Sequence, residues 1–297
     1  MNRKDFGQLL SSLRQDLDWT QFQLAEYADV DEAVISQLER GVKKFLEPEL
    51  IFRLMNTLQL TTIERREFVL AASGLEESQI VRQPSASART DAFDAVKTVE
   101  RMVNLVGEIR LPAYLSDDYG DVVAANNIIL AFYRVPPSVL EEASKIPGGF
   151  NAVHLNFGRD LIGRNHVLDN WDSYAINSMR SIRENSFHVR QKPYFKYLMN
   201  AFRNPAEYPF FDRYWKMVSS TENDKELNMD YFFYKHPEFG DLKYITSETV
   251  STTSFGKLHL VQSTPLNEGT NQVFDQLLKS VGTGVVRLAS WPEKPIH

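Results

Sequence analysis

The sequence predicts an α+β protein in two domains: an N-terminal all-α domain of five helices, and a domain that combines an antiparallel sheet with helices. Three observations carry this prediction. Apolar residues recur at helical spacing from Phe6 to Gly74, alternation of apolar and polar residues marks 111–126 and 229–266, and a stretch with Ser and Pro at 75–91 separates the two patterns. The expected parts are a first domain at 1–74, a linker at 75–91 and a second domain at 92–297.

Composition narrows the class of protein before any motif is considered. The 297 residues are 43% hydrophobic and 24% charged, and no run of about 18 apolar residues could span a bilayer. There are no cysteines, which removes disulfides, thiolate catalysis and cysteine-ligated zinc. The N-terminus leads into no apolar signal core, so a cytoplasmic location and no membrane partner are expected. The formal net charge is −6, so a contact with nucleic acid must rest on a local basic face.

The stretch TQFQLAEYADVDEAVISQLERG, which begins at Thr20, predicts two short helices joined by a tight turn. Thr20 and Gln23 form a capping box at the start of the first of them. Asp29 occupies the turn position usually given to glycine, because Asp tolerates a positive φ. Asp31 caps the next helix, and Gly41 suits the left-handed position that ends it.

Two more helices complete the all-α domain, after an amphipathic helix that opens the chain. Pro48 suits a first helical turn and precedes an apolar stripe. Thr61 and Glu64 form a second capping box, and Gly74 provides a stop. Five helices in about 74 residues make a compact unit.

A set of residues in the two short helices matches a known pattern, namely Thr20, Gln21, Leu24, Ala25, Val30, Ile35, Gln37, Leu38, Glu39 and Gly41. The set resembles the helix-turn-helix of lambdoid phage repressors and of the xenobiotic-response-element (XRE) class of bacterial regulators. The resemblance implies binding to double-stranded DNA, with residues 31–40 as the recognition helix in the major groove. It implies that Gln21 contacts phosphate and that Arg40, Lys43 and Lys44 hold the DNA backbone. The side chains implied to face base edges are Asp31, Glu32, Ala33, Ser36 and Gln37.

Asp29, Asp31 and Glu32 give the expected recognition helix an acidic tip, where phosphate should come near. Base reading tolerates such a tip, since Glu accepts from cytosine N4, Ala touches the thymine methyl and Gln pairs with adenine. The alternative is a helical hairpin that serves protein contacts only, as in an adaptor or an antitoxin. That alternative explains the acidic tip and leaves the second domain without a role.

After the linker, the sequence predicts a helix with a narrow apolar seam at alternating spacings of four and three residues. Such a seam covers its own domain more often than it forms a coiled coil between two copies. With fewer than three heptads, both interpretations stay open. The seam consists of Ala92, Val96, Val99, Val103 and Val106.

The rest of the second domain predicts two strands, several helices and then three strands. The segment LPAYLSDDYGDVVAAN is typical of two strands joined by a turn, and NNIILAFYRV of a helix. Helices rich in aromatic residues are expected at 170–185, 193–204 and 209–220, and an antiparallel meander at 229–266. This order indicates an α+β sheet with helices on one face.

Several segments match one family over nearly the whole chain, from about Phe6 to Leu278: ERREFVLAASG, LPAYLSDDYGDVVAAN, Asn170-Trp171, Arg180, FFDRYW, HPEFGDL and LVQSTPLNEGT. The chain resembles the MmyB-like transcription regulators, in which an XRE-type helix-turn-helix precedes a PAS-like ligand-binding domain. Residues 266–269 depart from the Pro-Gly pair that is more usual in the family. The tail GVVRLASWPEKPIH matches nothing in the pattern.

The resemblance implies a small, largely apolar and fatty-acid-like ligand between the sheet and the helices, and no other cofactor. Arg180 is the candidate partner of a ligand carboxylate, because a guanidinium fork matches that group. Trp171 lies nine residues before Arg180, which puts the two on opposite sides of one helix. Aromatic residues at these spacings are more often core than pocket wall. The candidate lining residues are Tyr114, Val123, Phe132, Phe157, Trp171, Arg180, Tyr194, Phe232 and Leu258.

An enzyme is the rival class. The histidines and carboxylates form no recognisable set: the sequence has no His-Glu-x-x-His, no glycine-rich phosphate loop and no Gly-x-Ser-x-Gly. We therefore expect no catalytic activity and no metal. The expected function is a ligand-responsive DNA-binding transcription regulator that forms a homodimer, with double-stranded DNA and a small apolar molecule as partners.

Overall fold

The computed structural model describes residues 2–43, 45–74, 95–159, 171–220, 231–253 and 255–296. The predicted linker, Lys44 and Ala92 lie outside the described residues.

The N-terminal part forms the expected five helices. Their apolar faces enclose one core that includes Leu9, Leu24, Ile35, Leu54 and Phe68, each fully buried. The helices are α1 (Arg3–Asp16), α2 (Gln21–Tyr27), α3 (Glu32–Glu39), α4 (Pro48–Thr57) and α5 (Thr62–Ser73).

The predicted caps of these helices are confirmed. Both capping boxes, at Thr20 and at Thr61, have the backbone and the side-chain hydrogen bond in place. Asp29 has a φ of 52° in the turn between α2 and α3, and Gly74 has a φ of 73° after α5. These positions fix the angles at which the helices meet.

The second part is built on a six-stranded sheet with the order β3-β4-β5-β1-β2-β6. All neighbouring strands run antiparallel. The first hairpin therefore joins the last one through β1 and β5, where Tyr114 faces Val261. The strands are β1 (Ala113–Asp117), β2 (Val122–Asn126), β3 (Phe232–His236), β4 (Gly240–Thr253), β5 (Gly256–Pro265) and β6 (Val285–Arg287).

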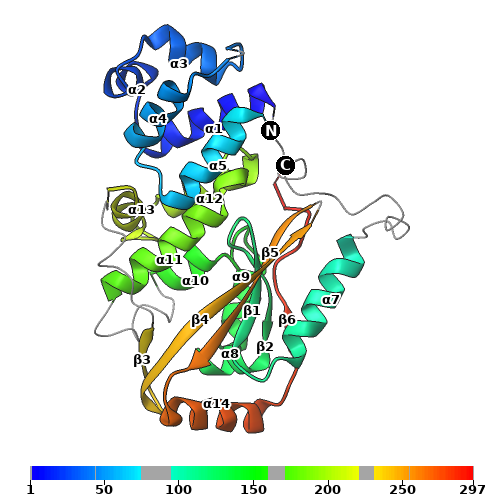
Figure 1. Ribbon diagram of the computed structural model, residues 1–297. Helices are drawn as coiled ribbons and strands as arrows, with labels where there is room; N and C mark the ends of the chain where they lie inside the picture. Colours follow the sequence, from blue (N-terminus) through cyan, green and yellow to red (C-terminus); the bar gives the residue numbers. More distant parts are fainter. Residues whose placement is uncertain are drawn as a thin grey trace.

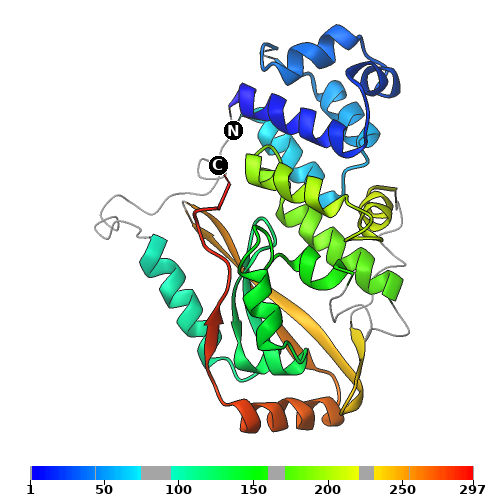
Figure 2. The same ribbon diagram turned by 180° about the vertical axis from the view of Figure 1, so that it is seen from behind.

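Helices cover both faces of this sheet, so the expectation of helices on one face is wrong (Figures 1 and 2). The valine seam of α7 (Ala95–Glu108) packs on Leu115 and Val123 of β1 and β2 through Val99, Val103 and Val106, whereas Val96 is exposed. The seam thus covers its own domain. On the opposite side lie the remaining described helices of the second part. Those nearest the sheet are α8 (Asn127–Phe132), α9 (Pro137–Ala143), α10 (Ala152–Phe157), α11 (Trp171–Asn185) and α14 (Glu268–Val281). Behind them lie the 3-10 helix η3 (Phe187–Val189), α12 (Pro193–Phe202) and α13 (Phe211–Ser220).

The two parts touch each other directly. Helices α1 and α5 lie next to α11 and α12 in both views (Figures 1 and 2). Phe187 of η3 belongs to the hydrophobic core of the five-helix part, although it is 113 positions beyond Gly74 in the chain. The first core is therefore completed by a residue of the second part.

Candidate functional site

The helix expected to read DNA presents its N-terminal half to solvent. Asp31 is the N-cap of α3 and accepts a hydrogen bond from the Ala33 amide at 2.7 Å. Ile35 and Leu38 face inward and are buried, which fixes the outer face of the helix. The exposed residues of this face are Asp31, Glu32, Ala33, Gln37 and Arg40, with Ser36 half-buried between them.

Glu39 ties α3 to the rest of the domain. Its carboxylate accepts from Arg14 Nε at 2.6 Å and from Arg14 Nη2 at 2.9 Å. It also accepts from the Gln21 side-chain amide at 2.7 Å. The amide nitrogen of Gln21 is therefore used inside the domain, while the proposed phosphate contact of this residue rests on the family resemblance.

The acidic excess of the five-helix part does not all face outward. Its 74 residues carry nine Lys or Arg and twelve Asp or Glu. Four of the acids, Asp16, Glu39, Glu64 and Glu67, pair with Arg14, Arg183, Arg190 and His188 inside or between the two parts.

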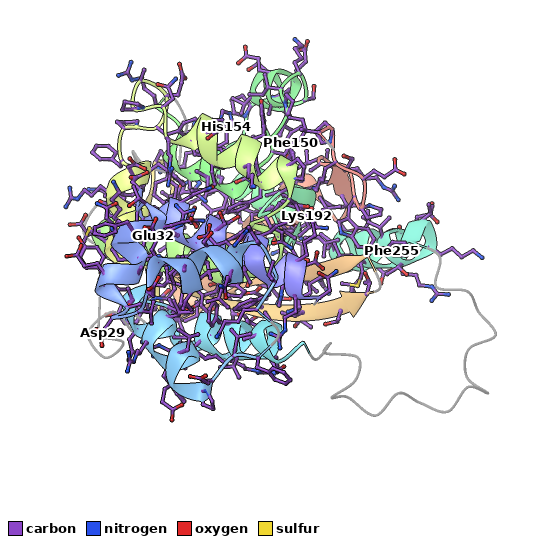
Figure 3. All side chains as sticks on the ribbon, turned by 90° about the horizontal axis from the view of Figure 1, so that it is seen from above. Asp29, Glu32, Phe150, His154, Lys192 and Phe255 are labelled. Atoms are coloured by element: carbon purple, nitrogen blue, oxygen red, sulfur yellow. The ribbon has the colours of Figure 1, made fainter. Side chains whose placement is uncertain are left out.

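The acids that remain near the recognition helix are few. Asp29 lies 3.2 Å from Arg53 Nη1, and Glu32 is exposed. Figure 3 places Asp29 and Glu32 on the side of the molecule away from Phe255. Arg40 follows the recognition helix directly, with Lys43 half-buried beyond it. Arg53 thus adjoins the acidic tip, while Arg40 and Lys43 lie at the other end of α3.

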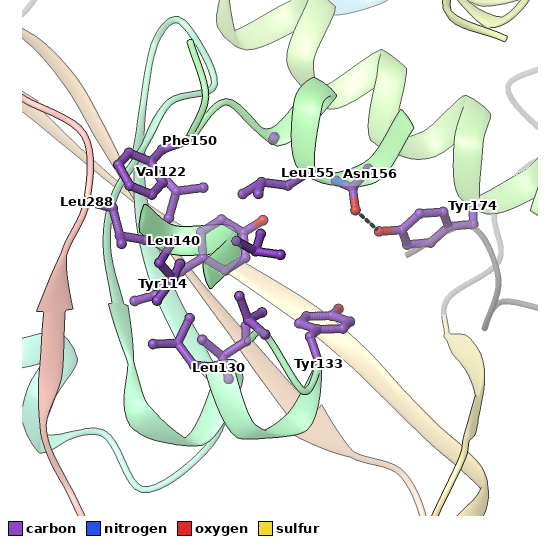
Figure 4. Close-up of a pocket in the computed structure, with 15 residues that line it drawn as sticks. Tyr114, Val122, Leu130, Tyr133, Leu140, Phe150, Leu155, Asn156, Tyr174 and Leu288 are labelled. Atoms are coloured by element: carbon purple, nitrogen blue, oxygen red, sulfur yellow. Dashed lines mark hydrogen bonds between the residues drawn. The ribbon is translucent and has the colours of Figure 1, made fainter. Parts of the chain in front are cut away.

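A cavity of about 140 Å³ lies on the sheet face opposite α7 (Figure 4). Its wall is largely aliphatic and aromatic. The lining residues are Tyr114, Val122, Ala125, Ile129, Leu130, Tyr133, Val135, Val139, Leu140, Phe150, Ala152, Leu155, Asn156, Tyr174 and Leu288.

The polar groups of this wall are three phenols and one amide. Tyr174 donates its hydroxyl to Asn156 Oδ1 at 2.8 Å, and the Tyr133 hydroxyl lies 3.2 Å from that of Tyr244. Burial raises the pKa of Tyr174 to about 12 and the pKa of Tyr114 and Tyr133 further, so all three phenols are neutral near pH 7. The residues that line the cavity therefore include no ionised group.

Of the nine residues predicted to line a pocket, Tyr114 lies in this wall. Seven others lie outside this wall: Val123 and Leu258 under α7, Phe132 and Phe232 in the cluster with α14, Phe157 in the cluster of α11 to α13, Trp171 at the border of those two clusters, and Arg180 on α11. Tyr194, also in the cluster of α11 to α13, lines a second cavity beside the first.

A bulge explains why Val122 and Ala125 line the cavity while Val123 and Ala124, between them in β2, face α7. Tyr114 pairs with Ala125, but Ser116 pairs with Val122, so Val123 is the extra residue of β2. A strict alternation cannot place such a bulge. Sequence reasoning also missed α9 and α10, although Pro137 at a first helical turn and Asn151 as an N-cap are start signals for both.

A second cavity, of about 370 Å³, adjoins the first and shares Phe150 and Leu288 with it. It lies between the loop at 143–150 and the tail at 288–295. The tail follows β6 along β2, where the Leu288 amide donates to the Val123 carbonyl at 2.9 Å. The C-terminal segment thus forms a wall of both cavities.

Lys294 anchors this tail. Its ammonium is buried against the carboxylates of Asp117 and Asp121, with Asp121 Oδ2 at 2.7 Å. Asp121 also accepts from the Tyr194 hydroxyl at 2.8 Å and from Asn151 Nδ2 at 2.9 Å. Burial and, in the same direction, the Asp121 carboxylate raise the pKa of Asp117 to about 7 against the opposing effect of Lys294.

A buried charge cluster joins the five-helix part to the second part. Glu64 of α5 accepts from Arg183 Nε at 2.8 Å, from Arg183 Nη2 at 3.1 Å and from Arg190 Nη2. The Thr61 amide of the capping box donates to the same carboxylate at 2.9 Å. Arg190 also lies 3.5 Å from Asp16, so two acids of the first part meet two arginines of the second.

Electrostatics keep Glu64 charged, whereas burial raises the pKa of Asp16. Burial acts to raise the pKa of Glu64, but the guanidinium groups of Arg190 and Arg183 outweigh burial and hold that pKa below its usual value. Burial lowers the pKa of Arg190 against the attraction of Glu64. Because arginine stays protonated over the whole physiological range, Glu64 is an ionised carboxylate in a buried interface.

Comparison with known protein families gives two matches. The description "MmyB-like transcription regulator ligand binding domain" matches residues 97–277, and the description "Helix-turn-helix" matches residues 10–64. No curated protein matches the chain. In the part of the chain that the structure describes, no helix is long and apolar enough to cross a membrane.

Proposed function

We propose a mode of action for this chain, which belongs to the MmyB-like transcription regulator ligand binding domain family and is a ligand-responsive DNA-binding regulator. In our proposal the cavity on the sheet holds a small, neutral and largely apolar molecule, and its occupancy changes how α3 meets DNA. The observation that carries the proposal is an apolar cavity, with polar groups from neutral side chains, in the domain that the ligand-binding family matches. A regulator of this kind works where the chromosome is, in the cytoplasm.

The proposed DNA contacts come from the outer face of α3. Glu32, Ala33 and Gln37 are exposed and offer base-reading groups, whereas the carboxylate of Asp31 is already engaged as the N-cap. Ser36 lies half-buried one turn along the helix. Gln21, Arg40, Lys43 and Lys44 are the proposed contacts to phosphate.

Gln37 is the residue whose replacement separates base reading from phosphate contact. Gln37→Ala should cost about 1–3 kcal/mol of binding free energy on the preferred site and little on random DNA, because a bidentate pair to adenine exists only on the right base. Gel shifts on the promoter of the protein's own gene and on scrambled DNA measure both. An equal loss on the two DNAs would show that Gln37 only positions the helix.

We further propose that the regulator acts as a homodimer, as the phage-repressor geometry requires. In that case, selection of binding sites should return a palindrome with half-sites about one helical turn apart. A single asymmetric half-site would contradict the dimer.

The volume and the polarity of the cavity define the proposed ligand. A cavity of about 140 Å³ resembles in size one of about 150 Å³ that binds benzene in another protein, so it holds a molecule of similar bulk, and a longer chain would extend past Phe150 and Leu288 into the second cavity. A carboxylate placed among the lining residues would have no cation beside it, and an unpaired buried charge is costly. Neutral donors and acceptors suit the phenols of Tyr114, Tyr133 and Tyr174.

A fatty acid fits this proposal only if its chain leaves the first cavity. The route with space is past Phe150 and Leu288 into the second cavity, whose lining carries Lys145. A long acid would then place its head group toward that lysine, with its chain among the aliphatic residues. Arg180, outside the lining, would act on an acid only at a distance.

Thermal melting of the full chain with matched probes tests the ligand class. We expect 1-octanol to raise the melting temperature more than octanoate, by mass-action stabilisation of the native state, because the alcohol brings no charge into the cavity. A control with Leu155→Trp, which fills the cavity, should lose the shift. A larger shift with octanoate, or with hexadecanoate alone, would replace the neutral ligand by an acid. If no probe shifts the melting temperature, the domain is better regarded as a protein-contact module.

A further inference from the structure

One helix touches both the cavity and the five-helix part. Tyr174 and Arg183 of α11 are nine residues apart, which corresponds to about 14 Å along the helix axis and to opposite faces of the helix. Tyr174 lines the cavity and donates to Asn156 of α10. Arg183 pairs with Glu64 of α5. The helix thus links the proposed ligand site to the DNA-binding domain without the linker.

The contact at the far end of α11 is buried and charged. The side chains of Glu64 and Arg190 are fully buried, and that of Arg183 is 4% exposed. The guanidinium groups of both arginines also lie over the ring of Trp215, at 5.8 and 5.5 Å from its centroid. Buried ion pairs of this kind depend strongly on geometry, because each partner has left water.

The stretch of α11 between the two ends leaves no room for local adjustment. Ala175, Ile176 and Met179 are buried in the cluster that α11 shares with α10, α12 and α13. Close-packed protein interiors have low compressibility, so a buried helix moves as a unit rather than deforming locally. A displacement of Tyr174 would therefore reach Arg183 as a movement of the whole helix.

Phe187 adds an apolar contact to the charged one. It follows α11 in η3, is fully buried, and belongs to the core of the five-helix part. His188 beside it lies 2.7 Å from Glu67 of α5. The segment 183–190 therefore holds α5 through ion pairs and through a shared core.

We infer that α11 is the coupling element of this regulator and that Glu64, Arg183 and Arg190 form the contact through which an occupied cavity changes the placement of the recognition helix. The inference rests on the proposed function for the existence of a ligand, but not for the docking itself. A ligand that binds unequally to two positions of α11 changes DNA affinity if those positions also place α3 differently, and couplings of this kind amount to about 5–150-fold.

The test compares ligand binding with its effect on DNA in four full-length proteins: the wild type, Glu64→Gln, Arg183→Lys and the control Glu49→Gln on the exposed face of α4. The probe is 1-octanol at saturation. We expect all four to keep the shift in melting temperature. The wild type and the control should show at least a fivefold change in DNA affinity on adding 1-octanol, and the two interface variants less than a twofold change.

Two outcomes of this test overturn the inference. One is a full change in DNA affinity in both interface variants. The other is a wild type that binds 1-octanol but shows no change in DNA affinity. Arg183→Lys keeps the positive charge and removes only the two parallel hydrogen bonds of the guanidinium group to Glu64, so this variant remains informative if Glu64→Gln does not fold.

A ligand-free measurement separates a failure of the coupling from a failure of the ligand proposal. If 1-octanol does not change the melting temperature of the wild type, the proposed ligand class fails. Hydrogen exchange on the variant Ala152→Leu then tests whether α11 couples the cavity to α5. This variant adds bulk to the cavity wall at α10. It should change exchange at least twofold at 183–192 and in α5, and the change in α5 should disappear with Glu64→Gln. Changes confined to the cavity wall would refute the inference.

Discussion

At the scale of the residue, Lys294 explains how the C-terminal tail is held. The ammonium offsets the charge of two buried carboxylates, Asp117 and Asp121. Without that cation, each of the two carboxylates disfavours the ionisation of the other. One lysine of a short irregular segment therefore decides the charge state of the β1–β2 turn.

Replacement of Lys294 by Met should lower the free energy of unfolding by about 3–5 kcal/mol above pH 7, the usual cost of breaking a buried pair. The loss should be smaller near pH 5. As the pH falls, the folded variant takes up a proton on the Asp117–Asp121 pair at a higher pH than the wild type, because loss of the ammonium raises the pKa of Asp117 above its wild-type value of about 7. This earlier uptake stabilises the folded variant relative to the wild type. Urea denaturation at pH 5 and pH 8 measures the difference. Lys145→Met, on an exposed pair with Glu141, should stay within about 0.5 kcal/mol at both pH values.

The same scale shows what sequence reasoning cannot find. Glu64 was predicted as a capping-box residue, and it is one, because that pattern needs only Thr61 three positions before. Its pairing with Arg183 spans 119 positions, and no local periodicity encodes such a distance. The cavity wall has the same character, since Tyr174 and Leu288 look like ordinary core residues in the sequence.

At the scale of the element, the crossing of α1 over α3 is set by a glycine. A Cβ on Gly7 would lie 2.4 Å from the carbonyl oxygen of Glu39 and 2.5 Å from that of Leu38. These are backbone atoms of the recognition helix and cannot rotate away. Gly7 therefore allows α1 to lie against the C-terminal end of α3.

Gly7→Ala should separate α1 from α3 and lower the free energy of unfolding by about 1–3 kcal/mol, in spite of the better helix propensity of Ala. Thermal melting checks the stability, and gel shifts on the preferred site should show weaker binding because α3 is displaced. Gly269→Ala in the first turn of α14 is the matched control, since its added methyl meets only Asn267 Oδ1, at 3.7 Å. A stability loss as large in the control as at Gly7 would rule out the contact with α3 as the cause.

Most elements were predicted from local signals, whereas α9, α10, α14 and β6 were not, although Asn267 caps α14. The helices α1 to α5 and the strands β1 to β5 carry caps, turns or alternation over five or more residues. The three residues of β6 carry no pattern, and they form a strand because β2 offers them a free edge. The bulge at Val123 puts Val122 on the face where strict alternation would put Val123. The pairing with β1 places this bulge, and the local sequence does not.

At the scale of the whole molecule, the shared core and the charge cluster should make the two parts unfold together. We expect one calorimetric transition in the wild type. Glu64→Gln should give two, with the five-helix part melting first, because Arg183 and Arg190 then remain buried without the carboxylate, at a cost of about 3–5 kcal/mol. Glu49→Gln should keep a single transition. Two transitions already present in the wild type would show that the domains are energetically independent.

The double use of Glu64 bears on how such proteins are assembled in evolution. A carboxylate at the third position of a helix is selected anyway, because it closes the capping box with Thr61. A DNA-binding domain with that common local feature therefore already carries the acceptor that Arg183 and Arg190 require. Exchange of the N-terminal domain for another whose last helix begins with a capping box would need few additional substitutions at the junction. A chimaera whose last helix begins without an acid would have to add one before its new sensor could control it.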